Sequence, residues 1–278
     1  MGKVVEFNDH GQVPLLAPDE PGPVELVNEQ GPAPMVLLCD HASAFIPRAL
    51  DGLGLDESQR ARHIALDIGI AAVTRCLARD LDAPAVMSGF SRLIVDPNRT
   101  IEVPELIPEV ADGVVVPGNR DLSAAQRALR LDTFYRPYHA AVAAAIAAKL
   151  SPGDGAGAGL GPAIVSMHSF TPVMDGFERP WQIGILWNRD PRMPAPMMAK
   201  LRARGITVGD NEPYSGRDHH GHTLHSQAEP LGLAHVLVEV RQDLIDTHQG
   251  AEEWAGVIRA VLHEILADPA IYKRQGPA

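Results

Sequence analysis

Cysteine is scarce in this chain of 278 residues, which contains only Cys39 and Cys76. Two thiols without CxxC spacing exclude a disulfide framework. The length suits one large α/β domain or two small ones, and a chain of this size buries about 75% of the surface of its unfolded form. It therefore needs no disulfide or structural metal for stability. We expect a buried, reduced pair of thiols in a cytoplasmic protein.

Basic residues and long apolar runs are also few. Lys and Arg total 24 against 35 Asp and Glu, which gives a net charge of -11. Such a chain is a poor candidate for binding nucleic acid or an anionic membrane, although a local arginine site can still bind a small anionic substrate. No apolar run approaches the length of a membrane span, and the N-terminus lacks the features of a signal peptide. We expect a monomer or a small homo-oligomer.

Short apolar runs alternate with helical patterns along the sequence. This alternation predicts a single α/β domain with a mostly parallel or mixed central sheet flanked by helices. We expect an extended lead-in over 1–33, one catalytic domain over 34–270, a long loop at 101–120 and a flexible connection at 151–162. Pro137 should kink or divide the second long helix. The expected strands are 35–38, 85–88, 93–95, 163–167, 182–187 and 235–240, and the expected helices are 56–77, 123–150, 193–204 and 252–266.

Three of the expected strands end in groups that bind metals or move protons. His41 follows the first of these strands, His168 follows another, and Glu239 lies near the end of the last. Ligands bind at the carboxyl ends of the strands in an open α/β sheet, so these distant residues can meet. A catalytic zinc usually takes three protein ligands and keeps one position open for water. The pattern therefore predicts a metallohydrolase with His41 and His168 as metal ligands.

A third metal ligand is needed, and we select Asp67. It follows His63 by four residues in the first predicted helix, so the two side chains should share one helical face. Asp40 and His63 remain alternatives for this position. Asp40 could instead orient His41 or its own turn, and His63 could be an outer partner of the site or a packing residue.

Glu239 is unusual because its strand is otherwise almost entirely apolar. A carboxylate in such a place is costly unless it is paired or coordinated. An ion pair with Arg241 is one explanation, since side chains two apart on a strand share a face. The other is catalytic, because a glutamate beside a metal-bound water is the usual general base in metal-assisted hydrolysis. We predict the catalytic role.

Two further groups carry charge or metal-binding potential. Arg92 and Arg99 flank one apolar run, and arginine binds carboxylates through a planar two-pronged fork. Spacing alone favours a structural ion pair for both. Four histidines crowd residues 219–225, where Gly221 and polar neighbours indicate a loop. We expect this loop to flank the site and assign none of its histidines as a ligand.

Six blocks occur in an order that is specific, although no single block is decisive. They are CDHAS at 39–43, HIALDIG at 63–69, SRLIVDPNR at 91–99, HSF at 168–170, DNEPYSG at 210–216 and LVEVRQDL at 237–244. Together they make the chain resemble the N-formylglutamate amidohydrolase family. The resemblance implies a phosphorylase/hydrolase-like fold similar to zinc carboxypeptidases and N-acetylmuramoyl-L-alanine amidases. It also implies hydrolysis of N-formyl-L-glutamate to formate and glutamate, a late step of one histidine degradation route.

The resemblance also implies roles for residues. It supports His41 and His168 as ligands of one zinc or another divalent ion and Glu239 as the base, whereas Asp67 is placed by position alone. Asn98 and Arg99 look like a pair that holds a substrate carboxylate. The resemblance and the position of the residues make Arg241 and Tyr214 supporting candidates for substrate or oxyanion contacts.

One segment departs from the family pattern, in which His-Ala-Glu often follows the tyrosine loop. The chain has Gln227-Ala228-Glu229 there, with His225 two positions earlier. If the histidine of the family's His-Ala-Glu segment has a catalytic role, His225 takes over that role in this chain or the role is lost. Two alternatives to the predicted function therefore remain: a deacylase or amidase with a different acyl group, and a metal- or ligand-binding protein without turnover.

Overall fold

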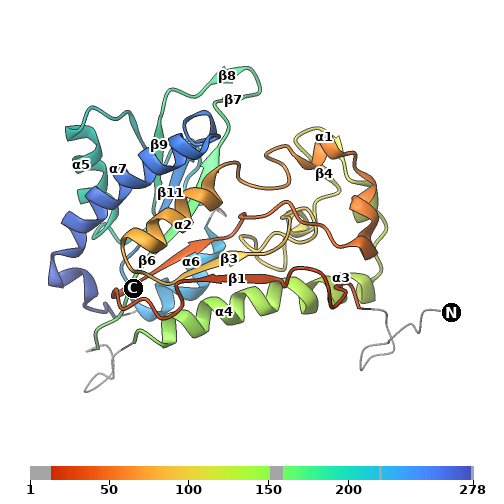
Figure 1. The fold of residues 1–278 in the computed structure, drawn as a ribbon, viewed down its shortest axis with the longest axis horizontal. Coiled ribbons are helices and arrows are strands. Elements are labelled where there is room, and N and C mark those ends of the chain that lie inside the picture. The colour runs from red at the N-terminus through yellow and green to blue at the C-terminus, as the bar shows by residue number, and fades with distance from the viewer. Residues whose placement is uncertain (1–13, 151–158, 219–220, 277–278) are drawn as a thin grey trace.

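Seven strands form a mixed sheet at the centre of the protein (Figure 1). The computed structural model describes residues 14–150, 159–218 and 221–276. Four neighbouring strands are parallel, β1 is antiparallel at one edge, and β9 and β10 run opposite to the four at the other. The predicted α/β domain with a mixed sheet is confirmed. In spatial order the strands are β1 (Val24–Val27), β3 (Ala85–Ser88), β2 (Met35–Cys39), β6 (Ala163–Phe170), β11 (His235–Arg241), β9 (Ile183–Leu186) and β10 (Val208–Asp210).

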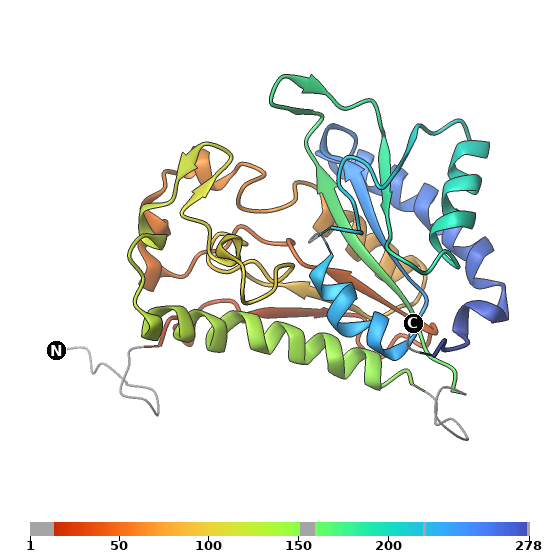
Figure 2. The ribbon, with the colours of Figure 1, turned by 180° about the vertical axis from the view of Figure 1, so that it is seen from behind.

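Helices cover both faces of this sheet. On one face lie α2 (Ile70–Asp80), α5 (Pro194–Ala203) and α7 (His248–Leu266), as Figure 1 shows. On the other lie α4 (Arg136–Ala147) and α6 (His222–Gln227), which are in front in Figure 2. None of the described helices is long and apolar enough to cross a membrane.

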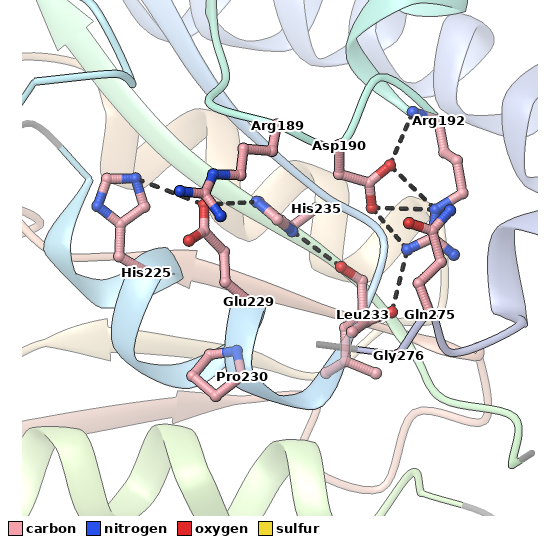
Figure 3. Close-up of a pocket in the computed structure, with 11 residues that line it drawn as sticks. Arg189, Asp190, Arg192, His225, Glu229, Pro230, Leu233, His235, Gln275 and Gly276 are labelled. Atoms are coloured by element: carbon pink, nitrogen blue, oxygen red, sulfur yellow. Dashed lines mark hydrogen bonds and ion pairs between the residues drawn. The ribbon is translucent and has the colours of Figure 1, made fainter. Parts of the chain in front are cut away.

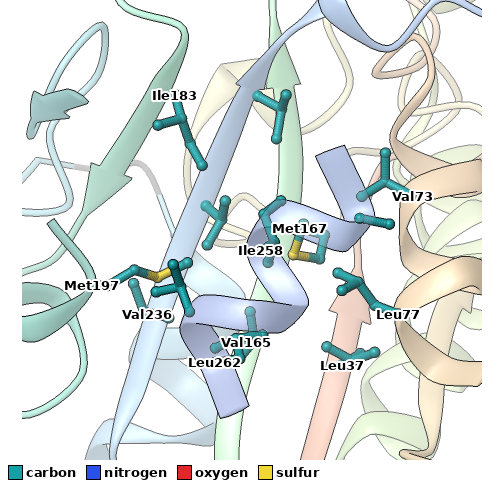
Figure 4. Close-up of a cluster of buried hydrophobic side chains, with 14 of the residues drawn as sticks. Leu37, Val73, Leu77, Val165, Met167, Ile183, Met197, Val236, Ile258 and Leu262 are labelled. Carbon is teal, nitrogen blue, oxygen red and sulfur yellow. The ribbon is translucent and has the colours of Figure 1, made fainter. Parts of the chain in front are cut away.

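Successive residues of the central strands supply two apolar cores. Leu37, Val165 and Val236 pack in one core with Ile258 and Leu262 of α7 (Figure 4). The adjacent residues along β2, β6 and β11 belong to the second core, beneath α4 and α6. Because both faces of these strands are buried, their sequences are continuous apolar runs, which is why the strands are predictable. The free thiols of Cys39 and Cys76 are buried, as predicted.

The first predicted helix is interrupted, and this part of the prediction is wrong. Asp56 caps α1 (Glu57–Arg60) with a capping box, but this helix is a single turn and α2 starts only after a run of turns over 61–69. Gly69 precedes α2 with a φ of +81°, and a Cβ there would lie 2.1 Å from the carbonyl oxygen of Ile245. Close packing against this backbone requires glycine and a break in the helix.

The apolar run at 93–95 is buried but is not a strand, which is a second correction. The backbone N–H of Ile94 donates to the carbonyl of Ser91 at 3.0 Å, so the chain turns here. Two residues later, the backbone N–H of Asp96 donates to the carbonyl of Leu106 at 2.7 Å. This turn directs Asp96 back toward the end of β2.

The second long helix is divided, as its proline predicts. Ser123 caps α3 (Ala124–Arg130), and a π-helical turn over Leu131–Tyr135 joins it to α4. Pro137 lies in the first turn of α4, where a missing N–H is tolerated. The 3₁₀ turns are Arg48–Gly54, Pro104–Leu106, Pro117–Asn119, Glu229–Leu231, Gln242–Leu244 and Pro269–Tyr272.

Several short strands were not predicted. Edge strand β1 lies inside the segment expected to be a lead-in, and β10 lies at the opposite edge. Two hairpins lie outside the central sheet: β4 (Val110–Ala111) with β5 (Val114–Val115), and β7 (Val173–Met174) with β8 (Phe177–Glu178). Three expectations concern segments outside the described residues: the start of the lead-in at 1–13, most of the 151–162 connection, and His219 and His220.

Candidate active site

Three buried side chains meet at the carboxyl ends of the parallel strands. Asp67 Oδ2 lies 3.3 Å from His41 Nδ1 and 3.0 Å from His168 Nδ1. These ligand atoms all lie within 4.8 Å of one another, so the three residues could hold a metal ion. Zinc bonds of about 2.0 Å in a tetrahedron imply ligand separations of roughly 3.3 Å. The spacing of this His–Asp–His group therefore fits one ion.

Local structure explains how the group forms. His41 follows the end of β2 and His168 is part of β6, which is hydrogen-bonded to β2. Asp67 lies in the turn before α2, where its N–H donates to the carbonyl of His41 at 3.0 Å. It does not share a helical face with His63, whose Nε2 lies 3.4 Å from Asp112 Oδ2 instead.

Each histidine has a second carboxylate on its outer nitrogen. His41 Nε2 lies 2.8 Å from Asp96 Oδ1, and His168 Nε2 lies 3.1 Å from Asp40 Oδ2. Histidine ligands of metals usually donate their other N–H to a carboxylate, which fixes the tautomer and the ring orientation. The outer contacts leave Nδ1 of both rings for an ion. Asp40 is thus an outer partner of His168. The sequence alternative in which Asp40 orients His41 is wrong.

The outer carboxylates stay ionised although they are buried. Burial raises the pKa of Asp40, but the hydrogen bond and charge of His168 outweigh it and hold the pKa at about 2. Burial likewise opposes ionisation of Asp96, and the charges of Arg92 and His41 keep its pKa well below the usual value. Sequence reasoning did not single out Asp96. The one sequence feature that could have indicated Asp96 is its position directly after the apolar run at 93–95.

Glu239 lies beside this group because of strand register. β11 pairs with β6 so that Glu239 is opposite His168. The side chain is buried, and its Oε2 has no hydrogen-bond partner among the described residues. Burial raises the pKa of Glu239 to about 7 against the opposing charge of His168. An unpaired buried carboxylate is costly, which points to a function.

Arg241 does not explain Glu239. Its guanidinium pairs with Asp243 at 2.7 Å and donates to the backbone carbonyls of Arg179 and Trp181. Arg241 is not among the described residues that line the cavity at the site. The structure therefore does not bring this predicted substrate contact into the site.

A cavity of about 120 Å³ opens onto the His–Asp–His group. Its lining includes Glu239, Asn98, Arg99 and Tyr214, so four predicted residues are brought together there. Asn98 is buried, and its side-chain oxygen accepts the N–H of Thr223 at 3.2 Å.

The two arginines of the 91–99 block differ. Arg92 is a structural ion-pair residue, with Nη2 2.6 Å from Asp96 Oδ2 and Nη1 3.4 Å from Asp67 Oδ1. Arg99 forms no ion pair with an acid in the part of the chain that the structure describes, and its Nη1 donates to the carbonyl of Asn98 at 3.1 Å. Arg99 is therefore the cation available to a ligand in the cavity.

The described histidines of the 219–225 loop do not line this cavity. His225 lies in a second cavity of about 340 Å³ (Figure 3), where its Nε2 is 3.7 Å from Glu229 Oε1. His235 Nε2 lies 3.6 Å from the same oxygen. His222 Nε2 lies 2.9 Å from the hydroxyl of Tyr135. The loop flanks the site through Thr223 rather than through the described histidines.

Comparisons with known proteins identify the family and related structures. The N-formylglutamate amidohydrolase family model matches residues 33–246. Gene product Atu2144 of Agrobacterium tumefaciens has a similar structure, with a TM-score of 0.84, 34% identity and coverage of 91% of this chain and 98% of the other. N-formylglutamate amidohydrolase from Ralstonia eutropha JMP134 has a TM-score of 0.59 and 20% identity over 91% of this chain and 99% of its own, which shows the fold alone. A search of curated proteins found no match.

The fold, the buried His–Asp–His group and the family match define a class, the hydrolases that cleave amide bonds. The family model covers most of the chain. The chain belongs to the N-formylglutamate amidohydrolase family.

Proposed function

We propose that the protein is a zinc-dependent amidohydrolase that cleaves the formamide bond of N-formyl-L-glutamate or a similar N-acyl amino acid. One observation carries this proposal: the buried Oε2 of Glu239 lacks a hydrogen-bond partner among the described residues and lies beside the His–Asp–His group. With this substrate the enzyme would act in histidine catabolism, and we expect it in the cytoplasm.

The residues present fit a zinc ion. Nδ1 of His41, Nδ1 of His168 and Oδ2 of Asp67 would hold it, since the outer carboxylates engage both Nε2 atoms. Two imidazoles and one carboxylate are a common zinc donor set, although other divalent metals accept it too. Bound zinc supplies two kinds of chemistry, polarisation of a carbonyl and a lower pKa for its water.

Glu239 performs the proton transfers. A pKa of about 7 suits a group that must both accept and release a proton near neutral pH. Its free Oε2 accepts the proton of the attacking water and then delivers it to the leaving amine nitrogen. Pairing between β11 and β6 keeps this carboxylate next to His168 throughout.

Arg99 and Asn98 define the substrate class. The guanidinium of Arg99 lines the cavity and has no carboxylate partner among the described residues, so it can bind a substrate carboxylate through two parallel hydrogen bonds. The cavity of about 120 Å³ is far smaller than the roughly 300 Å³ at which drug-sized pockets begin, so it suits a small acyl group and a compact anion. Tyr214 lines the same cavity and can contact the substrate.

The departure at residue 227 does not affect this cavity. Gln227 Nε2 lies 3.5 Å from His139 Nδ1, and Gln227 is not one of the described residues that line the cavity. The change from the family's histidine therefore gives no reason to favour a different acyl group.

Formate release from N-formyl-L-glutamate by the zinc-loaded protein tests the proposal. We expect this substrate to be cleaved faster than N-acetyl-L-glutamate, N-formyl-L-aspartate or N-formyl-L-methionine. Glu239→Gln should retain zinc, measured by elemental analysis, and lose about 10²- to 10⁴-fold in kcat. Near wild-type turnover by this variant with zinc bound would exclude Glu239 as the base. Absence of stoichiometric metal and of turnover in the wild-type protein would favour a ligand-binding function instead.

A further inference from the structure

Thr223 has polar contacts on two sides although it is completely buried. Its hydroxyl donates to Asp40 Oδ1 at 2.8 Å and lies 3.4 Å from the carbonyl of Pro97. Its backbone N–H donates to Asn98 Oδ1 at 3.2 Å. One residue thus contacts an outer carboxylate of the His–Asp–His group and the segment that carries Arg99.

The contact with Asp40 supports the orientation of His168. Asp40 is fully buried, and its Oδ2 faces His168 Nε2 at 3.1 Å. Its Oδ1 accepts two hydroxyl donors, from Tyr138 at 2.7 Å and from Thr223. These donors fix the rotation of the carboxylate, because each oxygen has its own partners. The hydroxyl of Ser166 also lies 3.4 Å from Oδ2, so loss of either donor to Oδ1 should loosen the carboxylate beside His168 rather than free it.

The contact with Asn98 holds the 97–99 segment, which leads to Arg99, against the start of α6. Thr223 lies in the first turn of α6, where backbone N–H groups have no partner within the helix. Gly221 precedes the helix and has no side chain to cap it. The side chain of Asn98 accepts one of these N–H groups from outside, so the start of α6 and the 97–99 segment hold each other in place.

We propose that Thr223 is a positioning residue that couples the metal ligand His168 to the Asn98–Arg99 substrate clamp. The proposal rests on the function proposed above and extends it to a residue that contacts neither metal nor substrate. The hydroxyl anchors α6 to Asp40, and the N–H of the same residue anchors Asn98 to α6. Removal of the hydroxyl should therefore weaken metal binding and the clamp together.

Three variants and one control separate this coupling from simple packing. Thr223→Val removes the hydroxyl and keeps the shape, Thr223→Ser restores the hydroxyl, and Tyr138→Phe removes only the other donor to Asp40. Thr74→Val is the matched control, because Thr74 is equally buried and its hydroxyl bonds to the carbonyl of Ile70 within α2. The readouts are zinc affinity by chelator competition and affinity of the zinc-loaded protein for L-glutamate by calorimetry.

We expect Thr223→Val to lose about tenfold in zinc affinity, the lower end of the range for partners outside the ligand shell. Its affinity for L-glutamate should fall about threefold to tenfold, as for one weakened hydrogen bond. Thr223→Ser should restore both affinities. Tyr138→Phe should lose zinc affinity alone, and Thr74→Val should lose neither.

The coupling would be contradicted if Thr223→Val lost affinity for zinc but not for L-glutamate. It would also be contradicted if this variant kept both affinities unchanged. Thr223→Ala, with folding checked by circular dichroism, replaces the valine variant if that variant does not fold. Absence of turnover by the wild-type protein would count against the proposed function alone, since neither affinity depends on turnover.

Discussion

In each of two cavities of this protein, two histidines lie around one carboxylate, and the two groups differ in the contacts that hold their side chains. In the first, Asp67 lies 3.3 and 3.0 Å from His41 and His168, and a further carboxylate holds the outer nitrogen of each ring. In the second, Glu229 lies 3.7 and 3.6 Å from His225 and His235. Only the first set has three ligand atoms close enough for a metal among the described residues.

This difference indicates that outer partners, rather than residue types alone, distinguish the group that could hold a metal ion. His235 Nδ1 is 2.8 Å from the carbonyl of Leu233, which turns this ring toward the backbone. His225 and Glu229 are both partly exposed, each with 28% of the side chain accessible. The two histidines at buried strand ends, and not the described histidines of the 219–225 loop, belong to the group that could hold a metal ion.

Removal of the carboxylate between the two histidines of each cavity should have the largest effect. Asp67→Ala should reduce zinc affinity and turnover by at least about 100-fold, because it removes a ligand rather than an outer partner, whose loss costs about 10- to 100-fold. Glu229→Gln in the second cavity should leave both within about twofold. Elemental analysis and formate release measure the two effects, and equal losses in both variants would contradict the distinction.

A smaller effect is expected from the outer carboxylate of the first cavity. Asp96→Asn keeps the shape but removes the charge that faces His41 Nε2 and Arg92. Zinc affinity should fall about 10- to 100-fold, as measured by chelator competition. Asp190 lines the second cavity, where its Oδ2 lies 2.5 Å from Arg192 Nη2. Asp190→Asn is therefore the control, and an equal fall in zinc affinity there would show that net charge, not orientation, is responsible.

The smallest effect concerns one arginine in the lining of each cavity, Arg99 in the first and Arg189 in the second. Arg99→Lys keeps the charge but loses the planar fork, so KM for N-formyl-L-glutamate should rise about tenfold with little change in kcat. Arg189→Lys, at the exposed arginine of the second cavity, should change neither constant. A fall in kcat without a rise in KM would contradict a role of Arg99 in ground-state binding.

The fold was predictable where burial on both faces leaves a continuous apolar run, as in β2 and β6. Edge strands β1 and β10 are short, and the latter contains Gly209, so neither leaves such a signal. The break before α2 depends on the contact of Gly69 with the backbone of Ile245, which is remote in sequence. Local periodicity cannot report such a contact.

The candidate site was predictable in part for the same reason. His41, His168 and Glu239 were expected to meet because parallel strands share a carboxyl edge, and the structure brings them together. Asp67 was predicted because it should share a helical face with His63, but residues 61–69 form turns and not a helix. A backbone hydrogen bond from Asp67 to His41 places its side chain in the site instead. The direction of Arg241 depends on partners in a different loop, which the sequence does not reveal.

The register between β6 and β11 fixes the position of Glu239 relative to His168, whereas other residues of the cavity lie on loops that can change. A slip of one residue would turn Glu239 to the opposite face of the sheet, so its distance from His168 is set by main-chain pairing and not by side-chain packing. Arg99 and Tyr214, by contrast, stand on loops, which tolerate insertion and replacement. We therefore expect related enzymes to change their preference for the substrate carboxylate by exchanging these loops, while the spacing of His168 and Glu239 stays constant.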